Sequence, residues 1–94
     1  MRRVELTPEA RIQYLNLPTE IADRFDELMS YLESNPHRLP PWCEVKSIGR
    51  RGGKEVFRAR AGTYRATYVF DAEVLRFTRF RLRKHMGYSS LPKS

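Results

Sequence analysis

The residues with the clearest chemical potential are arginines that alternate with small or apolar residues in two adjoining segments. Arg58 and Arg60 are separated by one residue, and Arg65 follows after the pair Gly62-Thr63. A guanidinium group presents a planar fork of N–H donors that matches a phosphate, and it stays protonated at physiological pH. Such cations bind polyanions or stabilise charge that develops on a phosphate, but they are poor general bases. We therefore predict a phosphate-binding surface.

These arginines share a surface only if their segments form a hairpin. We expect strands at Val56–Ala61 and Tyr64–Phe70, joined by a two-residue turn with Gly62 first. Opposed residues of such a pair lie on one face of the sheet, so Arg60 faces Arg65 there and Arg58 faces Thr67. The residues expected on the other face, as core, are Phe57, Ala59, Ala66, Tyr68 and Phe70. Like charges opposed across strands are destabilising, which favours a functional reason over an ordinary solvated face.

The remaining segments predict the layer that supports this hairpin. Arg2–Leu6 alternates like a short strand, and Thr7-Pro8-Glu9 is typical of a helix start, with that helix running to about Leu15. A second helix is expected from Thr19 to the pair Asn35-Pro36. One apolar stripe along it would be buried, formed by Ile21, Phe25, Leu28, Met29 and Leu32.

The segments after the second helix are mostly strands. Glu44–Ile48 is compatible with a short strand, and Gly49–Lys54 is expected to be a flexible basic loop. A last strand at Val74–Phe80 would follow a turn at Ala72-Glu73 and add Arg76 to the arginine face. Its Leu75 and Phe77 would join the core. The predicted fold class is α+β, a single domain over residues 1–94 with the order β-α-α-β-β-β, in which two N-terminal helices pack on one face of a small antiparallel sheet.

Charge divides the chain into unlike halves. Residues 1–45 hold 5 basic and 8 acidic side chains, whereas residues 46–94 hold 13 basic and 3 acidic ones. The strongly positive C-terminal half of the chain should attract polyanions, so we expect a nucleic acid or an acidic protein as partner. No apolar run approaches the ~20 residues of a membrane-spanning helix. A single cysteine, Cys43, forms no internal disulfide and favours a reducing cytoplasm, and no spacing of Cys, His and Asp indicates a metal or cofactor.

Several short motifs, in order, resemble the RelE/ParE superfamily of toxins from type II toxin–antitoxin pairs. The helical segment and the stretch from Phe80 onward also resemble the HigB-type members of this superfamily. The motifs that carry the resemblance are Leu6-Thr7-Pro8-Glu9-Ala10, Leu17-Pro18-Thr19-Glu20-Ile21-Ala22-Asp23-Arg24, Asn35-Pro36, Val45-Lys46, Phe57-Arg58-Ala59-Arg60, Tyr64-Arg65-Ala66-Thr67-Tyr68 and Phe80 to Tyr88. The resemblance implies a ribosome-dependent endoribonuclease that cleaves mRNA in the A site without a metal. It also implies a cognate acidic antitoxin, commonly in a heterotetramer.

The resemblance also assigns roles to individual residues. The ribose 2′-hydroxyl attacks the neighbouring phosphate, so the reaction needs a base, cations for the phosphorane and an acid for the leaving oxygen. The residues placed in this catalytic group are Arg58, Arg65, Arg83, Lys84, His85 and Tyr88. Those expected to contact the RNA backbone are Arg50, Arg51, Lys54, Arg60, Arg76 and Arg81. The proton transfers would fall to His85, to Tyr88 or to a lysine whose pKa neighbouring cations depress.

Two departures from the family pattern leave the function open between branches. Val56 stands where some RelE proteins have a lysine, and Leu82 stands where a glycine is usual. The ParE branch inhibits DNA gyrase with the same fold, so the alternatives are a gyrase inhibitor or an inactive RNA-binding homologue. The other aromatic and thiol groups are expected to be structural. Tyr64 and Tyr68 would be core residues, and Trp42 and Cys43 would close an edge of the core.

Overall fold

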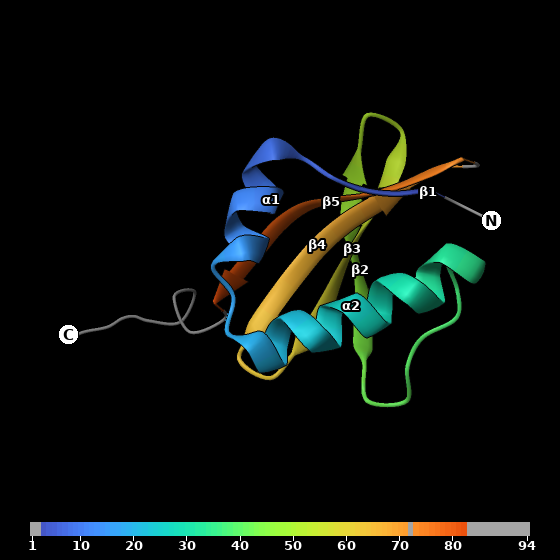
Figure 1. Ribbon diagram of the computed structural model, residues 1–94. Coiled ribbons are helices and arrows are strands. Elements are labelled where there is room, and N and C mark those ends of the chain that lie inside the picture. Colours follow the sequence, from blue (N-terminus) through green and yellow to red (C-terminus); the bar gives the residue numbers. More distant parts are fainter. Residues whose placement is uncertain (1–2, 72, 83–94) are drawn as a thin grey trace, which may run out of the picture.

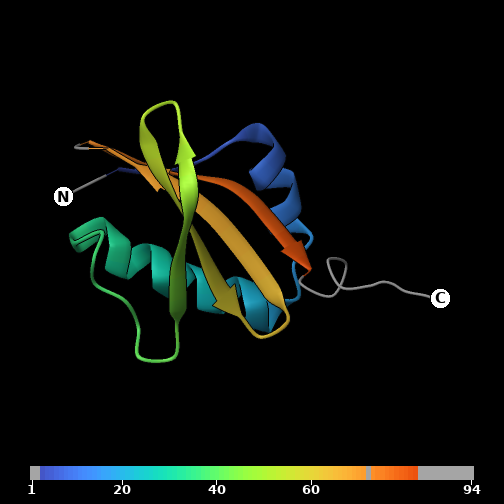
Figure 2. The same ribbon diagram turned by 180° about the vertical axis from the view of Figure 1, so that it is seen from behind.

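The computed structural model describes residues 3–71 and 73–82 and shows two helices against a five-stranded sheet (Figure 1). The elements are β1 (Arg3–Leu6), α1 (Pro8–Leu15), α2 (Thr19–Ser34), β2 (Glu44–Arg51), β3 (Lys54–Ala61), β4 (Tyr64–Phe70) and β5 (Val74–Leu82). Both helices lie on one side of the sheet, and Figure 2 looks onto the other side. The predicted α+β class is confirmed.

The strand arrangement differs from the expectation in two details. The sheet has the order β1-β5-β4-β3-β2, and β1 runs parallel to β5, so the sheet is mixed and not purely antiparallel. Parallel strands need a crossover connection, which the chain between β1 and β5 supplies. The predicted order β-α-α-β-β-β has three strands after the helices, but the structure has four. The additional strand is β2, because the segment that begins at Glu44 forms a full strand.

The prediction of a flexible basic loop at Gly49–Lys54 is wrong, because most of this segment belongs to strands. Arg50 and Arg51 belong to β2, Lys54 begins β3, and only Gly52 and Gly53 form the turn. Their φ angles of 56° and 79° fit a tight hairpin turn, in which both central residues need positive φ. The pairing of β2 with β3 therefore continues to Arg51 and Lys54, which the sequence analysis had placed in a flexible loop. The predicted turn at Gly62-Thr63 is confirmed. The predicted turn at Ala72-Glu73 includes Ala72, which lies outside the described residues.

Both helices begin and pack as their sequences predict. Thr7 caps α1, because its hydroxyl accepts a hydrogen bond from the Ala10 backbone N–H at 3.1 Å. Phe25, Leu28 and Leu32 of α2 are fully buried. They pack in one core cluster with the small residues Ala59 and Ala66, which let the helix lie close to the sheet, and with Tyr68, Phe77 and Phe80. Among the described residues, no helix is long and apolar enough to cross a membrane.

A β-bulge in β5 reverses which side chains point away from the helices. Tyr68 pairs with Phe77 but Thr67 pairs with Arg79, so Thr78 is the extra residue. Strict alternation from Leu75 and Phe77 would have put Arg79 in the core. Because of the bulge, Phe80 is buried instead, and Arg79 and Arg81 are exposed. A second irregularity at Ile48 shifts the register of β2 against β3 in the same way.

Candidate nucleic-acid interface

Cations from four strands form cross-strand rows on the sheet face that the helices leave open. In the first row Arg60 pairs with Arg65, and Arg65 pairs with Arg81. In the second row Lys46 pairs with Arg58, Arg58 with Thr67, and Thr67 with Arg79. We call the whole set the basic face. It comprises Lys46, Arg51, Lys54, Arg58, Arg60, Arg65, Arg76, Arg79 and Arg81.

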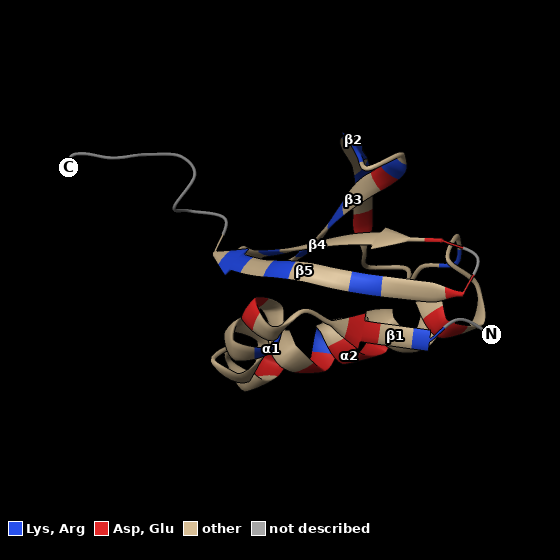
Figure 3. Ribbon diagram, turned by 90° about the horizontal axis from the view of Figure 1, so that it is seen from above, with Lys and Arg blue, Asp and Glu red and all other residues tan. Residues whose placement is uncertain are grey.

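Opposite charge lies on the helical layer. Figure 3 shows acidic residues grouped along the helices and basic residues along the strands. In α2 the acidic side chains are Glu20, Asp23, Asp26, Glu27 and Glu33, against the single basic residue Arg24. A polyanion that approaches this molecule is therefore repelled from the helices and attracted to the basic face.

Carboxylates partly neutralise at least three of the described members of the basic face. Arg60 lies 3.3 Å from Glu44, Arg76 lies 3.2 Å from Glu5, and Lys54 lies 3.2 Å from Asp71. Hydrogen bonds from Arg76 and Arg3 lower the pKa of Glu5. These pairs are largely exposed, so they contribute little to stability. They do reduce the charge that these three cations offer to a ligand.

The second row keeps its charge. Lys46, Arg58 and Arg79 make no ion pair with any residue in the described part of the chain. Arg58 is half-buried in the middle of the row, whereas Lys46 and Arg79 are exposed at its two ends. Uncompensated cations opposed across strands are unfavourable for folding, so this row is the best candidate for binding an anionic ligand.

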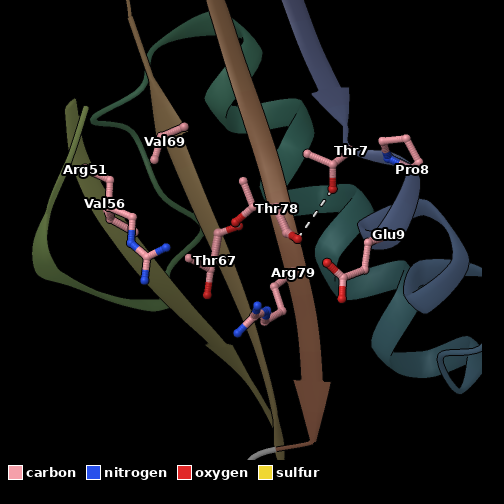
Figure 4. A pocket seen from close by; sticks show the side chains of 9 residues that line it. All are labelled: Thr7, Pro8, Glu9, Arg51, Val56, Thr67, Val69, Thr78 and Arg79. Carbon is pink, nitrogen blue, oxygen red and sulfur yellow. Dashed lines mark hydrogen bonds between the residues drawn. The ribbon is translucent and has the colours of Figure 1, made fainter. Parts of the chain in front are cut away.

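A pocket opens on the basic face beside this row (Figure 4). Its volume is about 610 Å³, and its lining residues are Thr7, Pro8, Glu9, Arg51, Val56, Thr67, Val69, Thr78 and Arg79. The β2–β3 hairpin rises from the sheet on the side away from the helices, as Figure 3 shows. The hairpin end thereby forms one wall with Arg51, and the start of α1 contributes to the opposite wall.

Most of the predicted site residues that the structure describes do lie together. Arg51, Lys54, Arg58, Arg60, Arg65, Arg76 and Arg81 all belong to the basic face. Arg50 does not, because it pairs with Glu55 and points to the opposite side, where its guanidinium donates to the Gly53 carbonyl at 2.6 Å. The predicted residues Arg83, Lys84, His85 and Tyr88 lie outside the described residues.

Sequence reasoning missed three charged residues of this region. Lys46 and Arg79 complete the second row, and Glu9 lies in the pocket. For Arg79 a signal existed, because Phe77 and Phe80 are three residues apart, and two buried side chains at that spacing in one strand require a bulge. For Glu9 there was none, since its place depends on how α1 meets β5.

The single thiol has a structural role. Burial raises the pKa of Cys43 to about 11, which disfavours the thiolate that a nucleophile would need. Trp42 donates its indole N–H to Glu27 at 2.9 Å. Trp42 and Cys43 both pack against the core, as predicted. Within residues 3–71 and 73–82 there is no group of three or more His, Cys, Asp or Glu side chains that could hold a metal ion.

The fold and the basic face together define the class: the chain has the RelE-like α+β fold. Its structural neighbours are RelE, YoeB and YafQ toxins of type II toxin–antitoxin systems. No protein-family model matches the chain, and no curated protein matches it either.

The similarity to solved structures extends over most of the chain. An archaeal RelE–RelB complex from Pyrococcus horikoshii has 26% identity and a TM-score of 0.74, over 87% of this chain and 94% of that one. The RelBE2 toxin–antitoxin complex of Mycobacterium tuberculosis has 29% identity and a TM-score of 0.64, over 87% and 98%. The YoeB dimer of Staphylococcus aureus shares the fold at 13% identity, with a TM-score of 0.69 over 85% and 94%.

Proposed function

We propose that this protein is the toxin of a type II toxin–antitoxin pair and that it cleaves mRNA in the ribosomal A site. The observation that carries the proposal is the second row of the basic face, where Lys46, Arg58 and Arg79 lie without ion-pair partners among the described residues. The neighbouring toxin structures support the toxin role, and the basic face supports RNA as the target. The cytoplasm, where ribosomes work, is the implied location.

The cleavage chemistry divides between charge stabilisation and proton transfer. When the 2′-oxygen attacks the adjacent phosphate, negative charge grows on the phosphorane oxygens. Arg58 and Arg65 lie on neighbouring strands that are fixed by backbone pairing on both sides, and both side chains are half-buried, which restricts the positions that their guanidinium groups can take. Preorganised donors of this kind are typically worth ~10²–10³ in rate each. Arg83 or Lys84 would add charge, and His85 or Tyr88 would carry the protons.

The other cations of the basic face would hold the RNA backbone. Arg60 and Arg76 are exposed enough to exchange their carboxylate partners for phosphates, and Arg51, Lys54 and Arg81 extend the same surface. Such contacts set affinity and orientation more than rate. The positive surface also suits an acidic antitoxin, whose carboxylates would take the place of the RNA phosphates and silence the toxin.

A direct comparison of two targets tests the proposal. Purified protein is incubated with ribosomes programmed with a defined message, and cut sites are mapped by primer extension; in parallel it is incubated with DNA gyrase and relaxed plasmid. We expect cleavage within the A-site codon and undisturbed supercoiling. Inhibition of gyrase with intact message would assign the ParE-like function, and neither effect would indicate an inactive homologue.

A further inference from the structure

The pocket beside the second row contains a carboxylate for which phosphate binding has no use. Glu9 is exposed, and it makes no ion pair with any described residue, although Arg51 and Arg79 line the same pocket. On a surface that binds only phosphates an acidic side chain is unfavourable, because it repels the ligand. A carboxylate that remains there is better suited to a part of the RNA that offers hydrogen-bond donors. The ribose 2′-hydroxyl offers one donor, whereas a base edge can offer two adjacent donors that match both carboxylate oxygens.

Glu9 is held in place by the contacts of Thr7, two residues earlier in the chain. The Thr7 backbone N–H donates to the Phe77 carbonyl at 3.0 Å, and the Thr7 hydroxyl donates to the Thr78 carbonyl at 3.4 Å. The same hydroxyl caps α1 through Ala10. The first turn of α1 is thereby fixed to β5 at the bulge, and Figure 4 shows the Glu9 carboxylate on the α1 side of that strand. A recognition group needs this kind of fixed support.

The rest of the pocket suits a planar, partly apolar group with charged neighbours. Val56 and Val69 are cross-strand partners and form an apolar floor on which a base can rest. Arg51 and Arg79 lie on either side of Thr67, where they can stack on the base or bind the flanking phosphates (Figure 4). The volume of about 610 Å³ is within the ~300–1,000 Å³ of small-ligand pockets.

We propose that this pocket is a base-recognition subsite in which Glu9 selects guanine. An ionised carboxylate has two acceptor oxygens and no donor. The Watson–Crick edge of guanine presents two adjacent donors, N1–H and the N2 amino group, whereas the same edge of adenine, cytosine or uracil presents acceptors beside one donor. A bidentate pair therefore forms with guanine alone. The inference rests on the proposed function, since it names the base that the nuclease prefers near its cleavage site.

The test exchanges the acceptor pair for one acceptor and one donor. Glu9→Gln keeps the size of the side chain, and an amide matches the N6 donor and N1 acceptor of adenine. The cleavage rates of the wild type and the variant are measured on ribosomes programmed with three messages, which carry guanosine, inosine or adenosine at one position of the A-site codon. The comparison is repeated for each of the three codon positions. Inosine keeps N1–H but lacks the N2 amino group. The matched control is Glu20→Gln, which removes the same charge from the first turn of α2.

We expect the wild type to cut best with guanosine at one codon position, less well with inosine and least with adenosine. Glu9→Gln should lower the preference for guanosine over adenosine by about 10-fold or more, and Glu20→Gln should leave it unchanged. If Glu9→Gln keeps the wild-type preference, or if the wild type shows no preference for guanosine at any position, the inference is wrong while the nuclease function stands.

Binding of short RNA separates this inference from the proposed function. Fluorescent tetranucleotides that contain one guanosine or one adenosine are titrated with the same three proteins. Glu9-dependent preference for guanosine without any message cleavage on ribosomes would refute the nuclease function and support the subsite. Absence of both cleavage and base preference would refute both.

Discussion

Replacing Arg58 by glutamine should lower the cleavage activity without lowering the stability of the fold. The positive charge of Arg58 supports the proposed activity, but its position opposite another cation is unfavourable for folding. Arg58 is half-buried, its direct partner on β2 is the cation Lys46, and beyond Thr67 on β4 lies Arg79. No described carboxylate forms an ion pair with it. Glutamine keeps most of the side chain's length and polarity, so Arg58→Gln mainly removes the charge.

The two effects have different expected sizes. A pair of like charges directly opposed across strands costs about 0.2–1 kcal/mol, so relief of the Lys46–Arg58 repulsion should leave the free energy of unfolding unchanged or raise it by up to that amount. Loss of one preorganised cation at the phosphorane should lower the cleavage rate by ~10²–10³. A residue that lowers stability while it supports activity is typical of a functional site.

Two measurements check this prediction, with Arg60→Gln as the control. Urea unfolding gives the free energy, and single-turnover cleavage on programmed ribosomes gives the rate. Arg60 lies on the same strand and face but is paired with Glu44, so its loss should cost at most about 1 kcal/mol and should weaken binding more than cleavage. If Arg58→Gln cleaves at the wild-type rate, or if it destabilises the fold by several kcal/mol, Arg58 is a structural residue and the reasoning fails.

Three further outcomes are expected. The logarithm of the association constant for single-stranded RNA should fall linearly with the logarithm of salt concentration, and Arg79→Gln should reduce the slope by about 0.7 if Arg79 contacts a phosphate. A slope near zero would argue against the basic face as the binding surface. Hydrogen bonds from the backbone of Val74 and Glu73, and from Lys54, lower the pKa of Asp71, so its contribution to stability is complete at neutral pH and is lost as the pH falls through that lowered pKa. Asp71→Ala should therefore lower the melting temperature at neutral pH. The difference in melting temperature between this variant and the wild type should become smaller in strong acid. Since partial burial raises the pKa of Cys43 to about 11, its thiol should react with iodoacetamide at neutral pH far more slowly than a free cysteine, and fast modification of the folded protein would contradict the raised pKa.

The amino-acid sequence by itself determined most of the elements and most of the two sheet faces. The stripe of Phe25, Leu28 and Leu32 indicated the buried side of α2, and Gly62-Thr63 indicated the turn that sets Arg60 opposite Arg65. These features depend on neighbours within a few residues, where helical periodicity, strand alternation and glycine conformation are local properties. The arginine face could therefore be predicted without coordinates.

The tertiary structure decided the features that depend on distant parts of the chain. The bulge at Thr78 arises where β5 pairs with β4, and it moves Arg79 out of the core and onto the basic face. Pairing of β2 with β3 turned the expected loop at Arg51 into a wall of the pocket. Glu9 reaches that pocket only because Thr7 binds the backbone of β5, about seventy residues later in the chain. Pairing and docking of this kind depend on the summed packing of the whole core, which no short stretch of sequence specifies.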